Sequence, residues 1–296
     1  MTELITATPG ATAEGNQEMR LRSDLTAKEV MREVGAVLRL SEKEAAALSI
    51  DDVDVPEDQS MIINMGPQHP STHGVLRLML ELQGERVLRC KPIIGYLHTG
   101  MEKTGEELTF MQGGTNVTRM DYLSPLNNEL VFSMAVEKLL GIDGDIPERA
   151  VWMRMLLSEL NRMSSHLLFL ATNGMDIGAV SMMIYGWRER EEVLRFFQKV
   201  TGLRMNHNFI RPGGLAADLP AGWRDDVLDI LDRLPERLHE YDILMTEQPI
   251  WRERLQGVGV ITAQEAVALG ATGPILRSTG VPWDLRRDMP YLHYDE

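Results

Sequence analysis

The 296-residue chain contains a single cysteine, Cys90. One thiol cannot close an internal disulfide, and it cannot supply the several thiolates that hold an iron–sulfur cluster. Any such cluster that works with this protein must therefore be bound by another chain, and we expect no metal or cluster in this one. A single cysteine also suits a reducing compartment.

Long apolar stretches are missing as well. A transmembrane helix needs about 20 predominantly apolar residues, and the longest local run, Leu167–Ala171, is far shorter. Residues 1–17 lack the basic start and the apolar block of a secretory signal. We therefore expect a protein that is soluble, or peripheral to a membrane through its partners.

Basic residues are outnumbered, with 30 Lys and Arg against 44 Asp and Glu and a formal net charge of −14. Sequence-independent nucleic-acid binding depends on cationic side chains that neutralise phosphates, so we expect no nucleic-acid partner. Solubility is the simplest explanation of the acidity. Hydrophobic residues make up 44% of the chain, which is an ordinary globular composition.

Composition and periodicity divide the chain into three parts. Residues 1–58 are polar and acidic, which is typical of an extension with a linker. Residues 59–100 alternate apolar and polar side chains with a period of two, which predicts a small antiparallel sheet. The expected strands cover 61–65, 76–82 and 87–94.

Residues 101–296 carry helical spacing and predict a bundle. The expected helices cover 126–140, 149–172, 180–200, 223–244 and 262–269. Pro235 should kink or split the fourth of these, and the charged run Arg188–Glu192 is expected to be a solvated face with ion pairs. The fold class is thus α+β, a small N-terminal antiparallel sheet followed by a predominantly α-helical bundle.

Two histidines stand four residues apart in Gly66–Gly74 (GPQHPSTHG). On a helix, this spacing would place His69 and His73 on one face for a metal ion. Pro67, Pro70 and the glycines oppose a helix, and no third ligand is nearby, so we predict a loop without a metal. Two interpretations stay open: a tight turn with hydrogen-bonded imidazoles, and a functional loop whose titratable groups transfer protons.

Arg119, Asp121 and Tyr122 precede the helix expected at 126–140. Arg119 and Asp121 could simply form an ion pair and Tyr122 could simply pack, with Ser124 as the helix cap. From the chemistry alone, this structural interpretation is favoured.

Glu159, Arg162 and His166 are three and four residues apart, so they line one stripe of the expected long helix. A satisfied polar stripe between helices is the favoured interpretation. Asp176 follows between two glycines, where it is either a cap for the next helix or a functional carboxylate.

Six separated segments are together more specific than any one of them. They are Gly66–Gly74, Gly95–Lys103 (GYLHTGMEK), Arg119–Glu129 (RMDYLSPLNNE), Val136–Leu140 (VEKLL), Met175–Gly178 (MDIG) and Arg211–Gly214 (RPGG). In this order and approximate spacing, the chain resembles the D subunit of the bacterial proton-pumping NADH:quinone oxidoreductase, respiratory complex I. The resemblance runs from about Met61 to the C-terminus.

The resemblance implies a fold like the large subunit of nickel–iron hydrogenases, in which the metal cavity has become a quinone pocket. That pocket forms against the B subunit, which carries the terminal iron–sulfur cluster, while NADH and FMN bind in other subunits. The C subunit and the membrane arm are further implied partners, on the cytoplasmic side of the bacterial inner membrane. The implied reaction reduces quinone, the substrate, to quinol and is coupled to proton pumping. A hydrogenase itself would need paired cysteine ligands, which Cys90 alone cannot provide.

By the same resemblance, His73 and Tyr122 match the quinone-contacting histidine and tyrosine of the family. Asp176 matches the carboxylate that pairs with that histidine, and Arg119 matches an arginine near the terminal cluster. His69 is a weaker candidate for quinone contact. Such donors suit the reaction, because the quinone oxygens need protons and hydrogen bonds as they gain negative charge. A non-catalytic scaffold of the same fold stays an alternative.

Three features depart from the family pattern. Thr99 stands where many relatives carry an arginine. Asn206, next to His207, stands where many have a histidine linked to the terminal cluster. The chain ends at Glu296, whereas the family usually continues, so the helical bundle is expected to be incomplete at its C-terminus.

Overall fold

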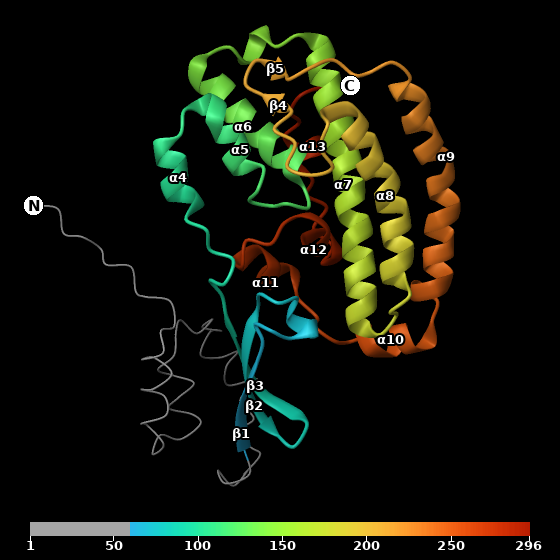
Figure 1. Ribbon diagram of the computed structural model, residues 1–296. Coiled ribbons are helices and arrows are strands. Elements are labelled where there is room, and N and C mark those ends of the chain that lie inside the picture. The colour runs from blue at the N-terminus through green and yellow to red at the C-terminus, as the bar shows by residue number, and fades with distance from the viewer. Residues whose placement is uncertain (1–59) are drawn as a thin grey trace, which may run out of the picture. The chain divides into compact units, whose positions relative to one another are not determined.

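The computed structural model describes residues 60–296. The expected N-terminal extension, residues 1–58, lies outside the described residues. The described residues divide into two compact units, one that ends at Thr99 and one that covers Gly100–Glu296. Each unit is drawn in Figure 1 and has its own architecture.

The first unit contains a three-stranded antiparallel sheet in the order β1-β2-β3. Its strands are β1 (Ser60–Met65), β2 (Arg77–Gln83) and β3 (Arg86–Ile93), as the alternating pattern predicted. Leu80 in the central strand pairs with Ile63 on one side and with Cys90 on the other. Met79, Leu80 and Glu81 are all buried. The middle of β2 is therefore covered on both faces, whereas simple alternation predicted burial of one.

The second unit is predominantly helical. Its helices are α4 (Met101–Glu107), α5 (Phe110–Val117), α6 (Pro125–Leu140), α7 (Glu148–Ile177), α8 (Met182–Thr201), α9 (Trp223–Tyr241), α10 (Pro249–Leu255), α11 (Ala263–Ala268), α12 (Gly273–Ser278) and α13 (Leu285–Asp288). The two-residue strands β4 (Ile210–Arg211) and β5 (Gly214–Leu215) form a small hairpin between α8 and α9 in the chain. The predicted α+β fold class is confirmed.

Local signals fix most helix ends. Pro125 occupies the first turn of α6, and Gly141 ends that helix with a φ of 71° that favours glycine. Pro235 lies inside α9, which is continuous from Trp223 to Tyr241, so the proline does not split the helix. Arg237, two residues after the proline, forms an ion pair with Glu189 of α8. A short π turn follows α9 at residues 242–246.

The three longest helices, α7, α8 and α9, run side by side in Figure 1. The main core cluster includes Leu126, Leu130, Met153, Leu157, Leu160, Val193, Phe196, Phe197, Phe209 and Ile210. Gly186 lets α8 approach α7 closely, because a Cβ at that position would lie 2.7 Å from the Cβ of Ala171. The core thus joins α6, α7, α8 and the segment that leads into β4.

The charged run Arg188–Glu192 lies largely at the surface, where ion pairs join α8 to α9. Arg190 departs from the predicted solvated face, because it is only 1% exposed. Its Nη1 donates to the carbonyl oxygen of Ser164 at 2.8 Å and to the Oγ at 2.7 Å. Arg190 follows Gly186 by four residues and precedes Val193 by three, so it falls on the inner face of the helix.

Candidate functional site

The histidine loop, Gly66–Gly74, is a closed turn in the first unit. The buried hydroxyl of Thr72 donates to the carbonyl oxygens of Pro67 and His69, both at 3.1 Å. Gly66 has a φ of 83°, and a Cβ there would lie 2.2 Å from the carbonyl oxygen of Leu76. The loop is therefore fixed from inside while its outer side chains face solvent.

The two histidines of this loop play different local roles. His69 precedes the short 3-10 turn Pro70–Thr72, and its Nδ1 accepts the Ser71 backbone N–H at 3.1 Å. A neutral His69 consequently carries its proton on Nε2. His73 ends the turn in the left-handed region with a φ of 55°, and both imidazoles are exposed. The prediction of a loop is confirmed, and His69 fits the interpretation of a hydrogen-bonded imidazole.

Tyr122 lies in the second unit, on the turn between α5 and α6, and is 48% exposed. Asp121 does not form the suggested ion pair with Arg119 in the described part of the chain. Its Oδ1 instead accepts the Leu123 N–H at 3.1 Å, and its carbonyl oxygen accepts from Asn128 Nδ2 at 2.9 Å. Arg119 and Tyr122 are both exposed, so Tyr122 does not simply pack.

Glu129 lies at the end of the same motif and is fully buried in α6. Its carboxylate accepts the Thr118 hydroxyl at 2.7 Å and the backbone N–H groups of Asn208, Phe209 and Ile210 at 2.6, 2.7 and 3.0 Å. Burial raises the pKa of Glu129 above its ordinary value, and these hydrogen bonds oppose the rise. Glu129 thus fastens the segment before β4 to the start of α6.

A second buried carboxylate, Glu137, binds the chain a few residues later, at the turn between β4 and β5. Arg154 of α7 binds it with two hydrogen bonds of 3.0 and 2.6 Å, and both side chains are nearly inaccessible. Arg154 also donates to the carbonyl oxygens of Arg211 and Gly214, while Glu137 accepts the Gly213 N–H at 2.8 Å. The motif Arg211–Gly214 is therefore bound by an ion pair between α6 and α7.

Asp176 lies in the last turn of α7, not between two helices as the flanking glycines suggested. Gly178 ends α7 with a φ of 107°, and the Ile177 carbonyl oxygen accepts a hydrogen bond from Arg254. Gly174 lies inside the helix and allows Met182 to approach closely, since a Cβ there would lie 2.7 Å from the Cβ of Met182. Asp176 is exposed. It is a helix-borne carboxylate and not an N-terminal cap.

His207, the neighbour of Asn206, is buried and 5% exposed. Burial lowers its pKa to about 4, so the ring is neutral at pH 7. Nε2 lies 3.1 Å from the Arg204 carbonyl oxygen, and the ring meets Phe197 edge-on at 5.1 Å between centroids. His207 therefore packs inside the second unit and is not presented at its surface.

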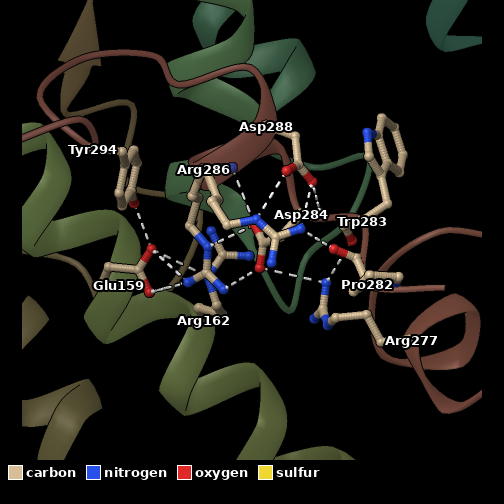
Figure 2. A network of polar contacts seen from close by, with 10 residues as sticks. Glu159, Arg162, Arg277, Pro282, Trp283, Asp284, Arg286, Asp288 and Tyr294 are labelled. Atoms are coloured by element: carbon tan, nitrogen blue, oxygen red, sulfur yellow. Dashed lines mark hydrogen bonds and ion pairs between the residues drawn. The ribbon is translucent and has the colours of Figure 1, made fainter. Parts of the chain in front are cut away.

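The polar stripe of α7 contacts the C-terminal segment of the chain, as Figure 2 shows. Glu159 accepts from Arg162 at 3.1 Å, from Arg286 at 3.4 Å and from the Tyr294 hydroxyl. Partial burial raises the pKa of Glu159, but hydrogen bonds from Tyr294 and Arg162 bring it below its ordinary value. Trp152 stacks on His293 in the same region at 5.0 Å. The prediction is confirmed for Glu159 and Arg162, although Glu159 binds the segment around α13 instead of a neighbouring long helix. Within residues 60–296, His166 of the same stripe makes no hydrogen bond or ion pair.

The candidate residues come from both units. His69 and His73 belong to the first, and Arg119, Tyr122 and Asp176 belong to the second. Their convergence on one pocket therefore stays a prediction. Within residues 60–296, no group of three or more His, Cys, Asp or Glu side chains is arranged to hold a metal ion. Over the same range, no helix combines the length and apolar character needed to cross a membrane.

Comparisons with known proteins point to one family. A family model described as the respiratory-chain NADH dehydrogenase 49 Kd subunit matches residues 176–296. A curated protein of Salinispora arenicola, the D 1 subunit of NADH-quinone oxidoreductase, is 54% identical over 246 residues, which cover 83% of this chain and 56% of the relative. The D subunit of the same enzyme from Acidothermus cellulolyticus is 55% identical with the same coverage. The counterpart from Frankia alni is 56% identical over 80% of this chain and 50% of its own length.

This chain belongs to the D-subunit family of NADH-quinone oxidoreductases. The predicted resemblance is thereby confirmed at the level of the family. The chain spans about half the length of the curated relatives it matches.

Sequence reasoning missed the buried polar residues that hold the turn after Tyr122 and the segment 208–214 in place. They are Glu129, Glu137, Arg154 and Asn161. One signal was available, because Glu129 and Glu137 are eight residues apart and adjoin Leu130 and Val136 on the apolar side of the expected helix. A carboxylate in such a position requires buried partners. The identity of those partners, far along the chain, was not encoded locally.

Proposed function

We propose that this chain helps to form the quinone-reduction site of a proton-translocating NADH-quinone oxidoreductase, as one subunit of the complex. Membership of the D-subunit family supports this assignment. The observation that carries it is the half-exposed side chain of Tyr122. Its turn is fixed by hydrogen bonds of the preceding residue, Asp121, and of the following residue, Leu123. A phenol held out in this way is suited to donate to a ligand from outside the unit.

In the proposed reaction, one quinone takes up two electrons and two protons and becomes a quinol. The electrons would come from a terminal iron–sulfur cluster in the B subunit. Tyr122 and His73 donate hydrogen bonds to the two carbonyl oxygens, and these bonds strengthen as negative charge develops. Imidazole titrates at about pH 6.5, so a histidine is a ready proton donor near neutral pH.

The remaining candidates support these two donors. Asp176 is an exposed carboxylate that is able to accept a hydrogen bond from His73 and hold its tautomer. Arg119 is an exposed cation that would favour the reduced state of a nearby cluster. His69 retains an Nε2–H donor for a second quinone contact, since its Nδ1 is occupied by Ser71.

The same proposal names the partners. The quinone pocket forms against the B subunit, with the C subunit and the membrane arm as further neighbours, at the cytoplasmic face of the bacterial inner membrane. NADH and FMN bind in other subunits. Loss of the His73 proton changes the charge of the pair with Asp176, and this change starts the coupling to proton pumping. Pumping that persists unchanged per quinone reduced in an Asp176→Asn complex would contradict the coupling step.

The test is quinone reductase activity of the whole complex with His73→Ala and Tyr122→Phe. We expect each variant to lose at least about tenfold in kcat/KM, since each removes one donor to a developing charge. Tyr185→Phe is the control, because Tyr185 packs against the core around Tyr241. Near-normal activity in both His73→Ala and Tyr122→Phe would favour the non-catalytic scaffold.

A further inference from the structure

The turn that carries Tyr122 leads into α6, whose N-cap residue, Ser124, supplies no side-chain capping hydrogen bond. Pro125 has no N–H, so the first helical N–H that needs a partner is that of Leu126. Leu126 is fully buried. A buried N–H without a partner is costly, so the partner must come from elsewhere in the fold.

Asn161 of α7 supplies that partner. Its Oδ1 accepts the Leu126 N–H at 2.9 Å, and its Nδ2 donates to the Leu123 carbonyl oxygen at 3.1 Å. The side-chain amide therefore spans the helix start, with its oxygen as an acceptor and one of its two N–H groups as a donor. Asn161 is 2% exposed, so water does not replace these bonds in the folded unit.

These contacts bear directly on Tyr122. The residue before it, Asp121, accepts the Leu123 N–H at its carboxylate. Its carbonyl oxygen accepts the Ser124 N–H and the side-chain amide of Asn128 in α6. The residue after it, Leu123, is bound to α7 through Asn161. Tyr122 thus projects from a turn that is hydrogen-bonded to α7 through the Asn161 side chain, next to the core contacts between α6 and α7.

We propose, building on the function proposed above, that Asn161 is a positioning residue for Tyr122. Asp176 lies on the last turn of α7, the helix that carries Asn161. The Asn161 amide therefore fixes the turn that carries Tyr122 to α7, and α7 also carries Asp176, the candidate carboxylate. This role accounts for a buried amide next to Leu160, a core residue of the same helix, at a position where an apolar side chain would otherwise pack.

The experiment uses the assembled complex with Asn161→Leu and Asn161→Asp. Leucine has the same number and branching of side-chain heavy atoms as asparagine and forms neither hydrogen bond. Aspartate keeps the acceptor for Leu126, and its carboxyl is able to donate to Leu123 only when it is protonated. Ser158→Ala is the matched control, because Ser158 is on the same helix, is 1% exposed, and has an Oγ without a hydrogen-bond partner.

We expect kcat for quinone reduction to fall by about tenfold to a hundredfold in Asn161→Leu, as for a reacting group displaced by about 1 Å. NADH oxidation per complex with a hydrophilic artificial acceptor should stay at the parental rate. The deficit of Asn161→Asp should shrink as the pH is lowered and the carboxyl gains its donor proton. Ser158→Ala should match the parent in both assays.

A second comparison separates positioning from a general defect. In a Tyr122→Phe background, Asn161→Asp should add little, because its effect passes through the phenol. An undiminished additional loss would overturn the positioning role. Parental kcat in Asn161→Leu and Asn161→Asp, with Tyr122→Phe impaired, would overturn it while leaving the proposed function intact. Parental kcat in Tyr122→Phe itself would overturn the proposed function.

Discussion

The two ends of the segment Arg119–Glu129 carry similar polar residues in opposite environments. Arg119, Asp121 and Tyr122 face solvent, whereas Glu129 is fully buried with four hydrogen bonds. The difference shows that charge alone does not identify a functional residue in this protein. A buried carboxylate with every oxygen bound holds the fold, and an exposed side chain on a fixed turn is available to a ligand.

The same contrast separates two arginines. Arg154 is 1% exposed and binds Glu137 together with two backbone carbonyl groups. Arg195 has a side chain that is 64% exposed and pairs with Glu191 and Glu192 of its own helix. Removing one partner of a buried ion pair leaves an uncompensated charge, whereas water screens an exposed pair.

The largest effect is expected for Arg154→Met. Loss of the guanidinium leaves Glu137 buried without its counterion and frees two carbonyl groups of the segment 211–214. We expect the free energy of unfolding of the full chain to fall by about 3–5 kcal/mol. Urea denaturation measures it. A loss below about 1 kcal/mol would mean that the pair does not hold the segment.

A smaller effect is expected from acidification, through His207. Its folded-state pKa is about 4, against about 6.5 in an unfolded chain. The unfolded state therefore takes up a proton first as the pH falls, and stability is lost between these two values. Between pH 7 and pH 5, we expect this residue to account for a loss of about 2 kcal/mol.

The His207→Leu variant isolates this contribution, because the remaining titratable groups are unchanged. Unfolding free energies at pH 7 and pH 5 should differ less in the variant than in the parent. Equal pH dependence in both proteins would show that His207 is not a buried neutral imidazole.

The smallest effect is expected for Arg195→Met, which matches the substitution at Arg154. The ion pairs of Arg195 lie within α8 and are exposed to water. We expect a change of less than about 0.5 kcal/mol in the unfolding free energy. If Arg195→Met lowered the unfolding free energy as much as Arg154→Met does, the proposed difference between exposed and buried ion pairs would be wrong.

Local patterns predicted much of the fold, because strand alternation and helical spacing are properties of neighbouring residues. The three strands and α6, α7 and α8 follow from them. The same logic misplaced Asp176, since the helix was predicted to end at residue 172, before Gly174, whereas it continues to Ile177 and Gly174 allows close contact with Met182. Arg190 was expected at the surface because its neighbours are charged, yet helix geometry turns it inward.

The candidate site was predicted only in part for a related reason. Tyr122 and His73 were predicted through the resemblance to the family, and both residues are exposed. Asn161, by contrast, acquires its role from Leu123 and Leu126, which lie 38 and 35 residues away. Nothing in the sequence around position 161 specifies that pairing.

One measurement tests the central distinction between framework and chemistry most directly. Tyr122→Phe and Glu129→Gln are compared in the same membranes for the amount of assembled complex and for quinone reduction per complex. We predict normal assembly with lost quinone reduction for Tyr122→Phe, and reduced assembly with parental turnover per complex for Glu129→Gln. The account is contradicted if Tyr122→Phe complexes reduce quinone at the parental rate, or if Glu129→Gln assembles normally and loses turnover instead.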